Sequence, residues 1–331
     1  MKILITVPQG DVFDRHFPDA VLSGLRELGQ VMLNPFERQF TESELRERLH
    51  EAEIVMTHWG SPQMTEDRLA AAPRLKLLAH CAGTVAHIAS EAVYARGIPV
   101  ISANRIMARY VAESALGYML AALHRIPKMD RAMHEGRWRR LDGEIASLSG
   151  SGIGLIGLGT VGRNLLDLLG PFHCRVHVYD PYLREGALEK WEYAQACSFE
   201  EAMSQPVVSI HAAKTPETFH MIDGRALKLM PDGGLLVNTA RGSLVDWEAL
   251  IAEVETGRIL AVLDVYEKEG PGNIPEALQR LENVILQPHA AANAVSWQMT
   301  QAIAEDIGRF LRGERLDLEV PLSQYRLMTQ E

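Results

Sequence analysis

The sequence has little cysteine, no long apolar run and no excess of positive charge. Its three cysteines among 331 residues are too few and too scattered for a disulfide framework or a zinc site, which favours a reducing, cytoplasmic setting. Because no stretch of 18 apolar residues occurs, we expect no membrane span. The formal net charge of −10 argues against nucleic acid or an anionic membrane as a partner. What remains is ordinary globular composition, 47% hydrophobic and 23% charged, at a length that suits two domains.

Short β-rich runs alternate with helical patterns in the first third of the chain. These runs occupy residues 3–7, 31–34, 54–58, 75–80 and 98–102. The first run has too short an apolar core for a secretory signal, so we interpret it as a strand. Thr41 followed by Glu44 is a capping-box signature for a helix over 41–49. This alternation predicts a parallel sheet covered by helices on both faces.

A long helical pattern at 109–126 precedes a second series of strands and helices. Its β-rich runs include 176–180, 207–213, 233–240, 259–266 and 283–289. A last helical pattern, 295–314, has no strand after it. The predicted fold class is therefore α/β, with two doubly wound parallel-sheet domains of the Rossmann-like or flavodoxin-like kind.

The stretch "GLGTVG" supplies Gly157, Gly159 and Gly162 in G-x-G-x-x-G spacing. An apolar run precedes it, a helical pattern follows it, and Asp180 ends the next apolar run. This order is the dinucleotide fingerprint, in which the pyrophosphate lies at the helix N-terminus. Asp180 would accept hydrogen bonds from the adenosine ribose and repel a 2′-phosphate, which favours NAD over NADP, although Arg184 lies nearby. The alternative is a tight strand–helix turn with a solvated aspartate.

Polar side chains follow three predicted strands of the second series. Arg241 comes after one, Asp264 with Glu267 and Glu269 after the next, and His289 after the last. Ligands bind outside the carboxyl ends of the strands in open parallel sheets, so these side chains should converge on the edge that carries the glycine loop. Each alone has a simpler explanation, such as a solvated arginine, an acidic surface loop or a structural histidine.

These motifs together resemble a known family. The stretches "NTARGSLVDWEAL", "AVLDVYEKEG" and "NVILQPH", with the glycine loop, "HAAKTPET" and "VAES", resemble the NAD-dependent D-isomer-specific 2-hydroxyacid dehydrogenases over about residues 75–315. The resemblance implies a discontinuous substrate domain, 1–104 and 296–331, with an NAD-binding domain, 105–295, inserted into it. The active site would lie in the cleft between them.

The resemblance also implies catalytic functions for three of the strand-end residues. Arg241 would bind the substrate carboxylate with two parallel hydrogen bonds. His289 would donate a proton to the keto oxygen as hydride arrives and accept it in the reverse direction. Glu269, rather than Glu267, would hydrogen-bond the imidazole and fix its tautomer.

Further positions match cofactor contacts of the family. Asp264 would contact the nicotinamide end of NAD, and the remaining matched positions are Thr160, Val161, Ala212, Thr239 and Ala240. No metal ligand set is implied.

The substrate side departs from the family pattern. The stretch "CAGTVAHI" at 81–88 lacks the usual aspartate, but Ala82 and Gly83 could still bind a carboxylate through the backbone. His80 is either a substrate contact or a packing residue. The cluster Arg137, Arg139 and Arg140 is either a phosphate site or, as the family suggests, part of a subunit contact.

The sequence thus predicts a cytoplasmic oxidoreductase, a dehydrogenase of the EC 1.1.1.- class that transfers hydride between NAD(H) and a small-molecule 2-keto acid or D-2-hydroxy acid. The resemblance implies a homodimer formed through the NAD-binding domain. Two alternatives stay open: a phosphite-type oxyanion dehydrogenase and an NAD-sensing, corepressor-like binding protein.

Overall fold

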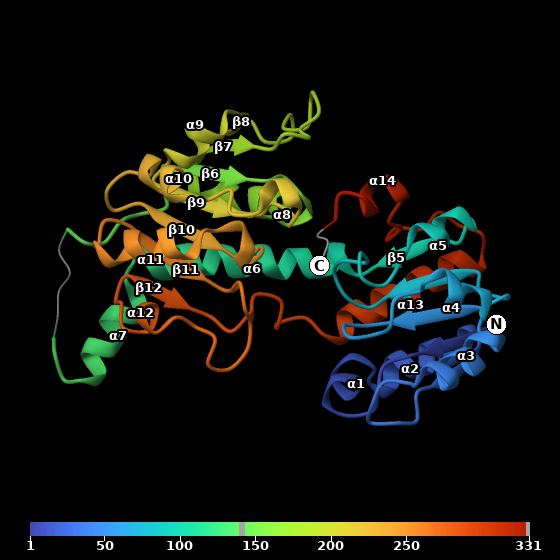
Figure 1. Ribbon diagram of the computed structural model, residues 1–331. Coiled ribbons are helices and arrows are strands. Elements are labelled where there is room, and N and C mark those ends of the chain that lie inside the picture. The colour runs from blue at the N-terminus through green and yellow to red at the C-terminus, as the bar shows by residue number, and fades with distance from the viewer. Residues whose placement is uncertain (139–142, 329–331) are drawn as a thin grey trace. The chain divides into compact units, whose positions relative to one another are not determined.

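The computed structural model describes residues 1–138 and 143–328, and the chain divides into two compact units (Figure 1). Unit 1 consists of Met1–Ala108 and Asn293–Glu331, and unit 2 of Arg109–Ala292. These divisions fall after residues 108 and 292, where the sequence placed them after 104 and 295.

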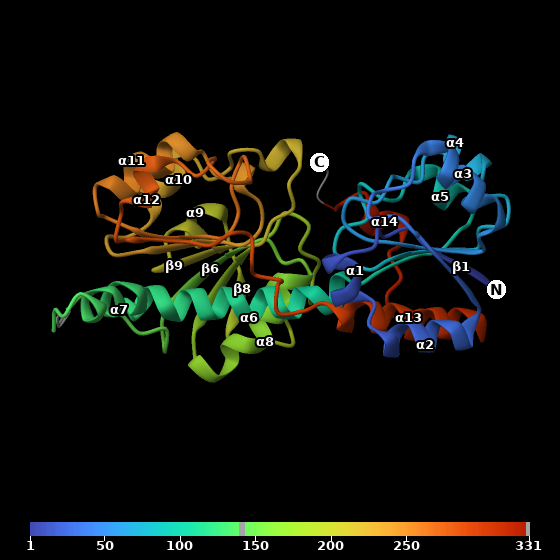
Figure 2. The ribbon, with the colours of Figure 1, turned by 90° about the horizontal axis from the view of Figure 1, so that it is seen from below.

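Unit 1 contains a parallel five-stranded sheet in the order β2-β1-β3-β4-β5. Its strands are β1 Lys2–Ile5, β2 Gln30–Leu33, β3 Ile54–Thr57, β4 Leu77–His80 and β5 Val100–Ser102. Its helices are α1 Asp11–His16, α2 Asp19–Leu28, α3 Glu42–Glu51, α4 Glu66–Ala70, α5 Glu91–Ala95, α13 Trp297–Leu311 and α14 Leu322–Tyr325. In Figure 2, α2 and α13 lie on one face of this sheet, and α3, α4 and α5 lie on the other. The capping box of α3 is confirmed, because Glu44 N donates to Thr41 Oγ1 and Thr41 N donates to Glu44 Oε2.

Unit 2 contains a parallel seven-stranded sheet in the order β12-β11-β10-β9-β6-β7-β8. Its strands are β6 Gly152–Ile156, β7 Arg175–Tyr179, β8 Ala194–Ala196, β9 Val207–Ile210, β10 Leu235–Asn238, β11 Leu260–Leu263 and β12 Val284–Leu286. Its helices are α6 Asn104–Leu123 (which begins before the division), α7 Ile126–His134, α8 Thr160–Leu169, α9 Phe199–Met203, α10 Gly224–Leu229, α11 Trp247–Glu255 and α12 Glu276–Gln279. Short 3-10 turns lie at Gly170–Phe172, Pro216–Thr218 and Gly242–Leu244. The predicted α/β class with two parallel sheets is confirmed.

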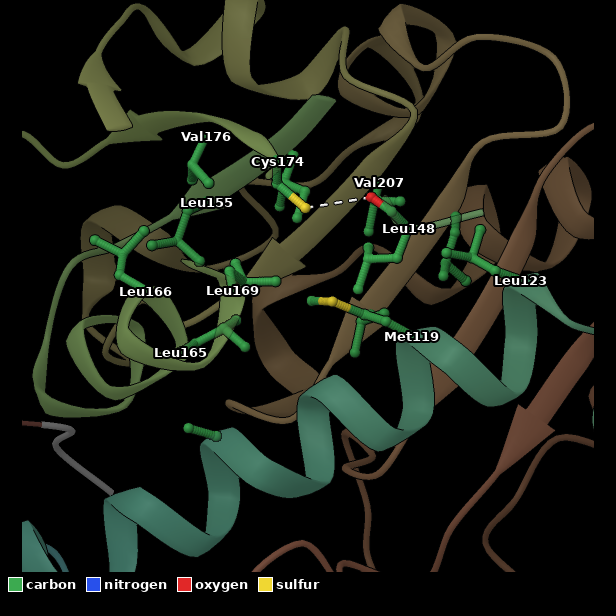
Figure 3. Packing of buried hydrophobic residues seen from close by; sticks show 14 of the residues in the cluster. Met119, Leu123, Leu148, Leu155, Leu165, Leu166, Leu169, Cys174, Val176 and Val207 are labelled. Carbon is green, nitrogen blue, oxygen red and sulfur yellow. Dashed lines mark hydrogen bonds between the residues drawn. The ribbon is translucent and has the colours of Figure 1, made fainter. Parts of the chain in front are cut away.

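Both faces of the unit 2 sheet are covered by helices. Figure 2 shows α6 and α8 on one face, with α9, α10 and α11 on the other. In Figure 3, Met119 of α6 packs near Leu165 and Leu169 of α8, below Leu155 of β6. Because helices cover both faces of this sheet, the carboxyl ends of its strands are the expected place for a ligand.

Two further observations concern the described residues alone. No helix within 1–138 and 143–328 is long and apolar enough to span a bilayer. In the same ranges, no three or more His, Cys, Asp or Glu side chains are grouped so as to hold a metal ion.

Candidate active site

The glycine loop leaves β6 and enters α8 with a close backbone approach. Gly157 has φ +93°, a conformation that favours glycine, and a Cβ there would lie 2.7 Å from Ala212 N. A Cβ on Gly162 would lie 2.9 Å from Gly157 O. At Gly159, by contrast, a Cβ would meet no described atom within 4 Å. The loop is therefore closely packed at Gly157 and Gly162 but leaves open space at Gly159. The amides at the start of α8 thus fit a dinucleotide pyrophosphate.

Asp180 follows β7 and holds the glycine loop in shape. Its Oδ2 accepts a hydrogen bond from Leu158 N at 2.7 Å, and its Oδ1 accepts one from Tyr182 N at 2.8 Å. The sequence indicated only a ribose contact for this carboxylate. The bond to the loop was missed because it joins two strand ends that are 22 residues apart.

The other predicted cofactor positions lie at the same sheet edge. Thr160 and Val161 form the first turn of α8, Ala212 follows β9, and Thr239 and Ala240 follow β10. Thr239 is 8% exposed, and its buried hydroxyl has no hydrogen-bond partner among the described residues. A buried hydroxyl without a partner is costly, so a bound ligand is a natural partner for it.

The turn that carries Arg241 is held by a residue that sequence reasoning missed. Asn238 is fully buried at the end of β10, where its Nδ2 donates to Arg241 O at 2.9 Å and its Oδ1 accepts from Ala240 N at 3.0 Å. The sequence feature that could have indicated Asn238 is its position as a polar residue at the end of an otherwise apolar strand. Arg241 Nη1 donates to Ala240 O at 2.7 Å, which directs the half-buried guanidinium along this turn.

The Arg241 turn packs directly on the segment that leads to Glu269. A Cβ on Gly242 would lie 2.0 Å from Tyr266 C and 2.3 Å from Glu267 N, so only glycine fits. Trp247 Nε1 donates to Gly242 O at 3.0 Å and fixes the same contact. Two loops from neighbouring strands, β10 and β11, are thereby joined backbone to backbone.

His289 and Glu269 lie within hydrogen-bond distance, with 2.8 Å between His289 Nδ1 and Glu269 Oε2. The two side chains are 46% and 44% exposed, so a small molecule can reach them. Glu267 instead lies 3.7 Å from His220 Nε2. The geometry thus distinguishes between the two glutamates of this loop.

Asp264 has a different environment from the one expected for a cofactor contact. It is fully buried, and its carboxylate accepts hydrogen bonds from Ala290 N at 2.8 Å, Ala291 N at 3.1 Å and Tyr118 Oη at 3.3 Å. Its contact with the nicotinamide end of NAD stays a prediction.

The remaining candidates lie elsewhere. Ala82 and Gly83 are buried in unit 1, where the Ser102 hydroxyl donates to both carbonyl oxygens, and substrate binding by this turn stays a prediction. His80 is fully buried and its Nδ1 lies 2.9 Å from Thr57 Oγ1, which is a packing environment. In unit 2, Arg137 is exposed and pairs with Glu135. Arg139 and Arg140 lie outside the described residues.

A doubly wound sheet with a glycine loop, and with an imidazole–carboxylate pair beyond its strand ends, is typical of the nicotinamide-dinucleotide-dependent dehydrogenases. Residues 116–291 match the family model described as the D-isomer specific 2-hydroxyacid dehydrogenase, NAD binding domain. The chain belongs to this family, and unit 2 is its NAD-binding domain.

The relatives carry several enzyme names. The chain is 32% identical to the D-3-phosphoglycerate dehydrogenase of Methanocaldococcus jannaschii, over 95% of this chain and 58% of that protein. It is 31% identical to the hydroxypyruvate reductase of Thermotoga maritima, over 82% of this chain and 90% of that protein. A D-lactate dehydrogenase structure from Aquifex aeolicus, complexed with NAD and lactic acid, is 25% identical with a TM-score of 0.71 and covers 95% of this chain and 96% of that one. The chain spans about half the length of the phosphoglycerate dehydrogenases it matches.

Proposed function

We propose that this chain is an NAD(H)-dependent enzyme that interconverts a 2-keto acid and a D-2-hydroxy acid. The observation that carries the proposal is the His289–Glu269 pair, 2.8 Å apart and open to solvent, at the sheet edge that also holds the glycine loop. An accessible imidazole oriented by a carboxylate is the arrangement that a general acid–base requires.

The proposed reaction needs one proton and one hydride. Because Glu269 accepts from His289 Nδ1, the Nε2–H of the protonated ring is available to donate to the keto oxygen. NADH, when bound, supplies the hydride to the keto carbon. The products are the 2-hydroxy acid and NAD⁺, and in the reverse direction neutral His289 takes the hydroxyl proton as Nε2 accepts it.

Arg241 binds the substrate carboxylate in this proposal. Its guanidinium presents N–H donors in a planar fork, and a carboxylate can accept two parallel hydrogen bonds from such a fork. Its Nη1 also donates to Ala240 O at 2.7 Å. The positive charge beside the keto group also stabilises the negative charge that develops on the keto oxygen as hydride arrives. The Asn238 bonds and the Gly242 contact set the direction from which this side chain reaches the substrate.

The remaining functional predictions belong to the same proposal. Asp180 accepts hydrogen bonds from the ribose hydroxyls and favours NAD over NADP, and Asp264 contacts the nicotinamide end of the cofactor. Ala82 and Gly83 contact the substrate through the backbone.

The enzyme is cytoplasmic and forms a homodimer through the NAD-binding unit, where Ile126, Met133 and Trp138 expose large apolar side chains.

The experiment is a substrate panel at fixed NADH concentration, followed at 340 nm. The substrates are pyruvate, glyoxylate, hydroxypyruvate, phenylpyruvate and 2-ketoglutarate, with phosphite and NAD⁺ in a separate assay. Turnover of at least one 2-keto acid is expected. Turnover of phosphite alone would replace the proposal with the oxyanion alternative, and NADH binding without any turnover would favour the binding-protein alternative.

A further inference from the structure

A buried carboxylate holds the loop that carries His289. Asp264 follows β11 directly and is fully buried. Its Oδ1 and Oδ2 accept hydrogen bonds from the backbone amides of Ala290 and Ala291, the two residues after His289. These amides lie outside any strand or helix, so Asp264 provides the hydrogen bonds that regular structure would otherwise supply.

Helix α6 also forms hydrogen bonds that hold the loop after His289. Ser114 Oγ donates to Ala291 O at 2.9 Å, and Tyr118 Oη donates to Asp264 Oδ1 at 3.3 Å. The two residues are four apart and therefore share one face of the helix. Burial, and next the charge of Asp264, raise the pKa of Tyr118 to about 12, so its phenol keeps the proton that it donates.

The His289 backbone needs such support. Its φ of +54° lies in the left-handed region, which residues with a side chain adopt rarely and only where the surroundings hold them. Its side chain is 46% exposed and contacts Glu269 at 2.8 Å on one side, so the backbone loop on the other side of the residue also contributes to fixing its position. A displacement of about 1 Å in a reacting group can lower a rate a hundredfold.

We propose that Ser114 and Tyr118 are positioning residues for His289. Neither residue is proposed to touch substrate or cofactor. Asp264 and Ala291 transmit their effect to the loop that presents the imidazole. The inference rests on the function proposed above for His289, and its tests are chosen so that the two can fail separately.

The first test compares Tyr118→Phe with Tyr110→Phe, a matched control eight residues earlier on α6. The Tyr118 variant loses only the hydroxyl and its bond to Asp264. We expect kcat for the best 2-keto acid to fall about tenfold, as a small misplacement of the acid requires. The dissociation constant of NADH, measured by fluorescence, should change less than twofold. The control should match the wild type, and a Tyr118→Phe enzyme with wild-type kcat would overturn the inference.

The second test repeats Tyr118→Phe in a His289→Ala background, with enzyme at micromolar concentration to measure residual turnover. If Tyr118 acts through the imidazole, its loss has no further effect once the imidazole is absent. A further tenfold loss would show a structural effect independent of His289 and would contradict the inference. Full turnover by His289→Ala alone would instead refute the proposed function.

The third test does not depend on turnover. Amide hydrogen exchange across residues 287–292 reports how firmly the loop is held. We expect the Ser114→Ala/Tyr118→Phe double variant to exchange about tenfold faster there than the wild type, with unchanged exchange in β6. Equal exchange in the loop would show that α6 does not hold it, and would overturn the inference whatever the enzyme does.

Discussion

Unit 1 should lose stability in mild acid because of buried histidines. His16, His58 and His80 are all at least nine-tenths buried, and the His16 and His58 rings lie 4.2 Å apart. Both ring nitrogens of His58 lack a hydrogen-bond partner among the described residues. Burial, and next the charge of His16, lower the pKa of His58 to about 3. Burial likewise lowers the pKa values of His16 and His80.

The direction of the effect follows from which state binds the proton. The unfolded chain takes up a proton at His58 near the ordinary pKa of 6.5, and the folded chain does so only near pH 3. Stability is therefore fully present above pH 6.5 and is lost as the pH falls from 6.5 toward 3. Because each pH unit in this window is worth about 1.4 kcal/mol, His58 alone should remove about 2 kcal/mol of unfolding free energy at pH 5.

The assay is urea unfolding at pH 7.5 and pH 5.0, followed by the fluorescence of Trp59. Its ring lies 4.6 Å from that of His58, and subtracting the signal of Trp59→Phe isolates it. Between pH 7.5 and pH 5.0, the unfolding free energy of the His58→Phe variant should fall by about 2 kcal/mol less than that of the wild type. His50→Gln, at an exposed histidine of the same unit, is the control and should behave as the wild type. If His58→Phe and the wild type lost the same unfolding free energy between the two pH values, His58 would not be the source of the acid sensitivity.

Three further predictions concern unit 2. Gly242→Ala places a Cβ 2.0 Å from Tyr266 C, so it should lower the melting temperature and abolish turnover, whereas Gly224→Ala, with 3.5 Å to its nearest neighbour, should do neither. Glu269→Gln should lower kcat about a hundredfold. Because the His289–Glu269 pair is half-exposed, the same substitution should change the unfolding free energy by less than about 1 kcal/mol. A larger loss of unfolding free energy would show that Glu269 supports the fold as well as catalysis. Asp180→Ser removes the charge that faces a 2′-phosphate, so the ratio of kcat/KM for NADPH to that for NADH should rise at least about tenfold; an unchanged ratio would remove Asp180 from cofactor selection.

Local signals made the cofactor side of unit 2 predictable. The glycine loop, its strand and helix, and Asp180 all lie between residues 152 and 180, so one motif covers them. For His289 and Glu269, which are separated by 20 residues and a strand, the strand-end argument predicted only that they converge on one edge. The family resemblance then selected Glu269 rather than Glu267 as the partner.

Other features depend on tertiary contacts that no short stretch of sequence contains. Strand β8, with the sequence AQA, was missed because it lacks β-branched and aromatic residues and lies at the edge of the sheet beside β7. The bond from Tyr118 to Asp264 joins residues 146 positions apart. The β-rich run over 259–266 is longer than β11, which ends at Leu263. Asp264 follows that strand as predicted, but its hydrogen bonds to the amides of residues 290 and 291 could not be predicted from the sequence.

We propose that His289 is the general acid of a 2-keto acid reductase. The most direct measurement is kcat for NADH oxidation by His289→Ala with the best 2-keto acid, beside His173→Ala. His173 is an exposed histidine of the same unit with nearly the same backbone conformation, φ +53° against +54°. We predict a loss of at least about a hundredfold in His289→Ala with unchanged NADH binding, and wild-type turnover in His173→Ala. Undiminished turnover in His289→Ala would contradict the account.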